Sequence, residues 1–163
     1  MRIIGVDPGT NVMGIGIVDD DPYLTLIHVE AHTWGRKQRT DRLANIAKTI
    51  EEYLVYYKPD VLAIEDQYVG INKRGSLHLA GAKDIVITEA TKKGVPVFEY
   101  APSTIKKAVA GHGGASKELV ALCVKAILNM RPLPMKHDAS DALAIAICHS
   151  HKAKTSQYMK AWK

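Results

Sequence analysis

Residues 2–18, RIIGVDPGTNVMGIGIV, decide how the rest of the chain is interpreted. Apolar runs over residues 2–7 and 13–18 flank the turn residues 8–10, and this pattern predicts a β-hairpin. Asp7 stands where the first strand enters the turn, and burying a carboxylate there without a partner would be costly. Its side chain could accept a backbone N–H hydrogen bond in an Asx turn, or it could bind a metal ion. Taken alone, these residues favour the Asx turn.

Length and composition predict one folded domain with an anionic partner. A chain of 163 residues with an apolar fraction of 47% is typical of a globule with a substantial core. No apolar run approaches the roughly 20 residues of a membrane span, and the first residues do not resemble a signal peptide. Cys123 and Cys148 have no metal-type spacing, so they are expected to be reduced core residues of a cytoplasmic protein. The net charge of +5 slightly favours nucleic acid over a basic surface that is merely solvated.

Alternating strand and helix patterns predict a mixed sheet covered by helices. Strands are expected over residues 2–7, 13–18, 23–31, 61–65 and 95–100. Helices are expected over residues 41–57 and 76–93, from a cap at Ser103, over 117–130 after a cap at Ser116, and from about Asp138. This order describes a single α/β domain over residues 1–151, with a five-stranded sheet flanked by helices, and a flexible tail over residues 152–163. His149 and His151 are expected on the surface of the last helix.

Four carboxylates stand at the ends of predicted core elements. Asp7 and Glu65 each end an apolar strand, and Asp138 and Asp141 lie three residues apart at the start of the last helix. The carboxyl ends of neighbouring parallel strands meet at one edge of a sheet, where α/β proteins bind ligands. Each acid also has a structural explanation: an exposed strand end for Glu65, a helix cap for Asp138 and a favourable first-turn charge for Asp141. The position of all four at element ends weakens those separate explanations.

If the four acids meet, they repel one another unless cations neutralise them. Oxygen ligands without histidine or cysteine partners favour Mg²⁺ or Mn²⁺. Two such ions about 3.5–4 Å apart can activate a water molecule and stabilise the leaving oxygen of a phosphodiester. Asp66 directly follows Glu65, but strand alternation sends it to the opposite face of the sheet, so we do not count it as a ligand.

Four stretches, spread over nearly the whole chain, match the order and spacing of a known family. They are GVDPGTNVMGIGIV (residues 5–18), AIEDQY (63–68), VFEYAPSTIKKAVAGHGGASK (97–117) and DASDALAIAICH (138–149). On these motifs the chain resembles the RuvC-type Holliday-junction resolvases of the ribonuclease-H-like superfamily. The resemblance implies a ribonuclease-H-like fold and a homodimeric, magnesium-dependent endonuclease. Such an enzyme nicks two opposing strands of a four-way DNA junction during recombination and repair.

The resemblance also implies roles for individual residues. By position, it makes Asp7, Glu65, Asp138 and Asp141 the catalytic metal ligands. It places Lys106 and Lys117 near the scissile phosphate, where positive charge would stabilise the transition state. Further DNA contacts are expected from Tyr68, which would stack on a base, and from Asn72, Lys73, Arg74 and Lys107. Without the family, the two lysines would be interpreted as a solvated helix face and Tyr68 equally well as a packing residue.

The leading hypothesis is therefore a junction-resolving endonuclease that uses two Mg²⁺ ions per subunit, with Mn²⁺ as a substitute. Its expected partners are four-way junction DNA, a second copy of the chain and a branch-migration motor complex, with residues 76–93 at the dimer interface. Gly9 and Gly14 are expected to let backbone and DNA approach closely. Alternatives are a non-cleaving junction-binding protein, a nuclease of other branched DNA or structured RNA, and an ATP-binding protein of the sugar-kinase and actin type. The last needs two lobes, for which this chain is too short.

Overall fold

The computed structural model describes residues 1–66, 73–130 and 137–161, and side chains within these ranges except at 73–80 and 157–161. The strands are β1 (Arg2–Asp7), β2 (Val12–Asp19), β3 (Thr25–Thr33), β4 (Val61–Glu65) and β5 (Val97–Tyr100). The helices are α1 (Arg39–Tyr57), α2 (Lys73–Lys92), α3 (Pro102–Ala110), α4 (Lys117–Ile127) and α5 (His137–Ala161). Each strand begins and ends within two residues of its predicted position. Within the described residues, no helix has the length and apolar character needed to cross a membrane.

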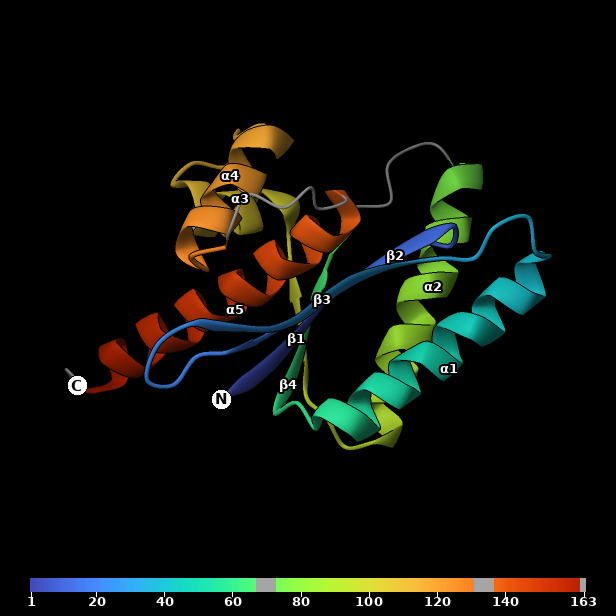
Figure 1. Cartoon of the computed structure of the whole chain (residues 1–163), viewed down its shortest axis with the longest axis horizontal. Coiled ribbons are helices and arrows are strands. Elements are labelled where there is room, and N and C mark those ends of the chain that lie inside the picture. The colour runs from blue at the N-terminus through green and yellow to red at the C-terminus, as the bar shows by residue number, and fades with distance from the viewer. Residues whose placement is uncertain (67–72, 131–136, 162–163) are drawn as a thin grey trace.

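The five strands form one mixed sheet in the order β3-β2-β1-β4-β5. The pairs β1–β2 and β2–β3 are antiparallel, whereas β4 runs parallel to β1, and β5 runs parallel to β4. Figure 1 shows α1 and α2 on one side of this sheet and α3, α4 and α5 on the other. The predicted α/β class, with a mixed five-stranded sheet flanked by helices, is confirmed.

Strand alternation gives the sheet a separate apolar core on each face. On one face, Ile3 and Ala63 belong to a buried cluster that also contains residues of α3, α4 and α5. On the other face, Ile4 and Leu62 belong to a cluster with residues of α1 and α2. Consecutive residues of a central strand therefore pack against different helices.

Helix α5 packs directly on the backbone of the β1–β2 hairpin because glycines face it. A Cβ atom added at Gly5 would overlap the carbonyl oxygen of Ala142, and one added at Gly14 would overlap that of Asp138. The space at Gly14 is therefore filled by α5, which corrects the expectation that this glycine makes room for DNA. A Cβ atom at Gly9 would likewise overlap the carbonyl oxygen of Val12 within the turn.

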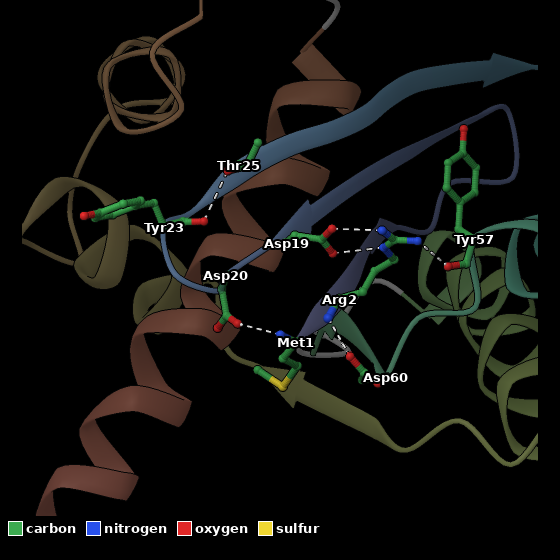
Figure 2. Close-up of polar contacts among 8 residues, drawn as sticks. All are labelled: Met1, Arg2, Asp19, Asp20, Tyr23, Thr25, Tyr57 and Asp60. Carbon is green, nitrogen blue, oxygen red and sulfur yellow. Dashed lines mark hydrogen bonds and ion pairs between the residues drawn. The ribbon is translucent and has the colours of Figure 1, made fainter.

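Arg2 ties the start of β1 to its neighbours at the other end of the sheet (Figure 2). Its Nε and Nη2 donate hydrogen bonds of 2.9 and 2.8 Å to the two carboxylate oxygens of Asp19, at the end of β2. Its Nη1 donates to the carbonyl oxygen of Tyr57 at 3.0 Å, and its backbone N–H donates to Asp60 Oδ2 at 2.6 Å. Because the Arg2–Asp19 pair is bidentate, it favours the hairpin register in which Asp7 lies opposite Gly14.

Several helix ends differ from their predicted positions. The N-cap of α3 is Ala101, without a side-chain hydrogen bond, and Pro102 opens the helix, so Ser103 lies inside it rather than capping it. Proline suits this first position because the N–H it lacks would have no partner within the helix. At the other end of the chain, α5 continues to Ala161, across the boundary at residue 151 where the tail was expected to begin.

The prediction that His149 is a surface residue is also wrong. Its side chain is buried, with Nδ1 2.8 Å from the hydroxyl of Tyr100 and its ring centroid 4.6 Å from that of Phe98. Burial lowers the pKa of His149, and the nearby charge of Asp20 opposes this effect. His151 is exposed, as predicted, and its Nδ1 lies 3.0 Å from the carbonyl oxygen of Ala108.

We expect Gly5→Ala to lower the free energy of unfolding by about 1–3 kcal/mol, because the added methyl group forces α5 away from β1. Urea unfolding measures this change. The matched control is Gly81→Ala in α2, where the nearest atom to an added Cβ is Arg39 Nη2 at 3.5 Å. That variant should be unchanged or more stable by up to about 1 kcal/mol, since alanine favours a helix. Equal effects of the two substitutions would contradict the close packing of α5.

The buried His149 predicts a loss of stability in acid. Because its pKa is lowered in the folded protein, the unfolded chain binds the proton more readily. Stability contributed by neutral His149 should therefore be present above about pH 6.5 and decline below it, by at most about 1.4 kcal/mol at pH 5.5. We expect His149→Gln to show a smaller difference in unfolding free energy between pH 7.5 and pH 5.5 than the unsubstituted protein. Identical differences would show that His149 does not titrate on unfolding.

Candidate active site

Asp7 and Glu65 lie next to each other at the carboxyl edge of the sheet. Strands β1 and β4 are parallel, with Val6 opposite Ile64, so the residues that follow this pair are Asp7 and Glu65. Alternation places both on the face covered by α5, the face to which Gly5 and Ala63 also belong. The predicted meeting of two strand-end acids is confirmed.

The first turns of α5 bring two more carboxylates to the same edge. Asp7 lies opposite Gly14 in the hairpin, and Gly14 is the residue whose missing side chain admits the backbone of Asp138. Asp141, one turn further along α5, lies on the same side of the helix as Asp138. The start of α5 thus meets the ends of β1 and β4 through backbone packing.

All four acids line one pocket of about 420 Å³. Lys106 of α3 and Lys117 of α4, both predicted from the sequence, also line it. The rest of its wall includes apolar residues that sequence reasoning missed, namely Val12, Pro102, Ile105 and Val120. Ile105 and Val120 could have been identified as inward-facing from helical periodicity, but periodicity does not show that they face the acids.

Burial and the charges of neighbouring carboxylates raise the pKa of Asp7. Burial is the main cause that raises the pKa of Asp7 to about 7, and the charges of Asp141, Glu65 and Asp138 raise it further, whereas Lys117 lowers it. Asp7 is therefore a buried carboxylate that shares one pocket with three other acids.

Lys117 provides positive charge at the rim of the acid cluster. As predicted, α4 is capped by Ser116, whose Oγ accepts a hydrogen bond from the backbone N–H of Leu119 at 3.2 Å. The helix ends at Ile127, three residues before the predicted end. Lys117 is the first residue after the cap, and its Nζ lies 3.5 Å from Asp141 Oδ2. The charge of Asp141 is the main cause that raises the pKa of Lys117, so its side chain is a cation facing the pocket.

Of the other predicted DNA-binding residues, only Lys107 has a side chain among those that the structure describes. Lys107 is exposed on α3 and does not line it. Tyr68 and Asn72 lie outside the described residues, and so do the side chains of Lys73 and Arg74, which belong to the start of α2.

The four acids share a pocket without forming a finished ligand sphere. In the part of the chain that the structure describes, no three acidic, histidine or cysteine side chains already form a group that could hold a metal ion. Their convergence is a matter of the backbone: two adjacent strand ends and one helix start supply all four.

The chain is similar to known proteins over nearly its full length. The profile of the family "Crossover junction endodeoxyribonuclease RuvC" matches residues 3–149. A protein of that name from Geobacter sp. (strain M21) is 39% identical over 163 residues, covering 98% of each chain. A relative of the same name from Syntrophomonas wolfei is 34% identical, covering 99% of this chain and 95% of the relative.

A solved structure has the same fold. The structure of Thermus thermophilus RuvC in complex with Holliday junction substrate superposes with a TM-score of 0.88 at 33% identity, covering 96% of each chain. The resemblance inferred from the sequence motifs, including the ribonuclease-H-like architecture, is confirmed. This chain belongs to the RuvC family of crossover junction endodeoxyribonucleases.

Proposed function

We propose that this protein resolves four-way DNA junctions by hydrolysing phosphodiester bonds in the acidic pocket, with paired nicks in opposing strands during recombination and repair. The observation that carries the proposal is the convergence of Asp7, Glu65, Asp138 and Asp141 on one pocket of a RuvC-family chain. The substrate is supported by the Thermus thermophilus relative, whose structure holds a Holliday junction.

The donor set of the pocket fits a hard divalent cation. The four acids offer only oxygen ligands, which Mg²⁺ prefers and Mn²⁺ accepts. The raised pKa of Asp7 reflects first its burial and second the charges of the neighbouring carboxylates, which a bound cation would offset. We propose that Asp7, Glu65 and Asp138 hold two Mg²⁺ ions per subunit, with Asp141 completing the set. When bound, such ions would activate the attacking water and neutralise the leaving oxygen.

The remaining wall of the pocket supplies charge and shape for the reaction. Water attacks the phosphorus in line and expels the 3′ oxygen, which leaves a 5′ phosphate. Lys106 and Lys117 would stabilise the negative charge that develops on the phosphate oxygens. The buried apolar side chains of Ile105 and Val120 form part of the pocket wall, and an apolar wall strengthens electrostatic interactions beside it. Lys117 also offsets the charge of Asp141 through their ion pair.

The assembly follows from the substrate. Two nicks in opposing strands need two pockets, so we propose a homodimer with one pocket in each subunit and with α2 at the interface. Tyr68, Asn72, Lys73, Arg74 and Lys107 would then contact the junction outside the pocket. We propose that the protein acts in the cytoplasm together with a branch-migration motor complex.

Cleavage of four-way, three-way and linear duplex DNA, compared side by side with and without Mg²⁺, tests the function. We expect metal-dependent nicks in opposing strands of the four-way junction only. Asp7→Asn should bind the junction with unchanged affinity but cut it at least about 100-fold more slowly, because it loses a carboxylate at the reacting phosphate. Asp41→Asn, in the exposed first turn of α1, is the matched control and should cut normally.

Binding without nicking by the unsubstituted protein, in both Mg²⁺ and Mn²⁺, would instead identify a non-cleaving junction-binding protein. Equal cleavage of the three-way junction or of structured RNA would identify a nuclease of broader specificity. Normal cleavage by Asp7→Asn would remove Asp7 from the catalytic set.

The charge of Asp7 also predicts a stability change that needs no substrate. Because folding raises the pKa of Asp7 from 3.8 to about 7, the metal-free protein loses stability as the pH rises between these values, and the full cost of the ionised group is present above about pH 7. At pH 8 we expect Asp7→Asn to raise the free energy of unfolding, by up to about 4 kcal/mol, as measured in EDTA. Added Mn²⁺ should then raise the melting temperature of the unsubstituted protein more than that of the variant. A destabilised Asp7→Asn protein in EDTA would show that the carboxylate has a structural role in the turn.

A further inference from the structure

Lys83 of α2 joins two strand ends on the face of the sheet opposite the pocket. Its Nζ donates a hydrogen bond of 2.9 Å to Asp66 Oδ1 and lies 2.5 Å from Glu99 Oε2. The side chain of Lys83 is only 18% exposed, whereas those of its two partners are 58% and 45% exposed. A single, largely enclosed ammonium group therefore connects α2, the end of β4 and the end of β5.

This connection begins one residue away from a pocket acid. Asp66 follows Glu65 directly, and its backbone N–H donates a hydrogen bond of 2.8 Å to the carbonyl oxygen of Tyr100. Glu65 lies opposite Tyr100 in the parallel register of β4 and β5, and Glu99 precedes Tyr100. Strand alternation directs Glu65 to the α5 face and Asp66 to the α2 face, so holding the Asp66 side chain restricts the backbone that carries Glu65.

The effect of Lys83 on the pocket is geometric rather than electrostatic. The charges that shift the pKa of Asp7 are those of Asp141, Glu65, Asp138 and Lys117, and Lys83 is not among them. Lys83 lies on the other side of the sheet, and its two carboxylate partners neutralise it. What it can supply is a fixed orientation of the strand ends.

We propose that Lys83 is a positioning residue for the nuclease reaction. Its paired contacts with Asp66 and Glu99 hold the ends of β4 and β5 in register and keep Glu65 directed into the pocket. The role of Glu65 in that pocket rests on the proposed function. This interpretation gives Asp66, the acid that the metal site does not use, a function of its own.

The test compares Lys83→Met with Lys83→Arg in the full-length protein. We expect Lys83→Met to lower the affinity for Mn²⁺, titrated alone by calorimetry, and kcat for junction cleavage by about 10-fold each, since supporting residues of a metal site have effects of this size. Junction affinity measured in EDTA should stay within about twofold of the unsubstituted protein. Lys83→Arg keeps the charge and should restore most of both losses.

The matched control is Lys93→Met, which removes an ion pair of 2.7 Å with Glu51 just beyond the other end of α2. It should leave Mn²⁺ affinity and kcat unchanged. If Lys83→Met behaves like Lys93→Met in both measurements, or if Lys83→Arg fails to restore them, the positioning role is overturned. Should Lys83→Met fail to fold, Asp66→Asn and Glu99→Gln each weaken one of the two contacts, because each removes the carboxylate charge that pairs with Lys83. Intermediate losses in both then support the proposal, and unchanged values overturn it.

The two proposals fail in different ways. If the unsubstituted protein does not nick junctions, the proposed function is wrong, but the Mn²⁺ titration still measures whether Lys83 orients Glu65. If the unsubstituted protein nicks junctions and Lys83→Met matches it in every measurement, only the positioning role is wrong.

Discussion

The contact between α5 and the bare backbone of the β1–β2 hairpin is the constraint on which the rest of the structure depends. Gly5 and Gly14 present no side chains to the helix, so the helix backbone lies against the strands at Ala142 and Asp138. The same contact closes one of the two apolar cores and sets the start of α5 beside the end of β1. Because the acids of α5 lie in its first turns, their placement beside Asp7 follows from this packing. Fold and site therefore share one interaction.

Bringing the four acids together costs free energy of folding, which the packing of the rest of the fold offsets. Burial raises the pKa of Asp7 to about 7, and repulsion from the other three carboxylates around the pocket adds to this rise. Lys117 offsets part of the repulsion through its contact with Asp141. The acids are carried by two strands and a long helix whose packing holds them in place, which is how a rigid scaffold maintains an unfavourable charge arrangement. A site assembled for reaction rather than for stability is typical of enzymes.

The sequence was sufficient to predict the strands and the meeting of Asp7 with Glu65, because both depend on local patterns: apolar runs, turn residues and strand ends. It was insufficient wherever a three-dimensional neighbour decides the outcome. His149 was misplaced because α5 is enclosed by the sheet and by two other helices, so its polar residues do not mark an exposed face. The link between Lys83 and Asp66 spans 17 residues and joins a helix to a strand end, which no spacing rule captures.

Consecutive acids at the end of β4 show why residue type alone does not define a site. Glu65 and Asp66 have the same charge, yet the period of two in a strand sends them to opposite faces. Glu65 meets like charges in the pocket, whereas Asp66 meets the ammonium group of Lys83. A neutral residue in place of Asp66 would leave Glu99 as the ion-pair partner of Lys83 and would remove the ion pair between α2 and the residue that follows β4. Glu65, which meets like charges, and Asp66, which meets a cation, are adjacent in the chain. The contact between Asp66 and Lys83 therefore also limits the conformational freedom of Glu65.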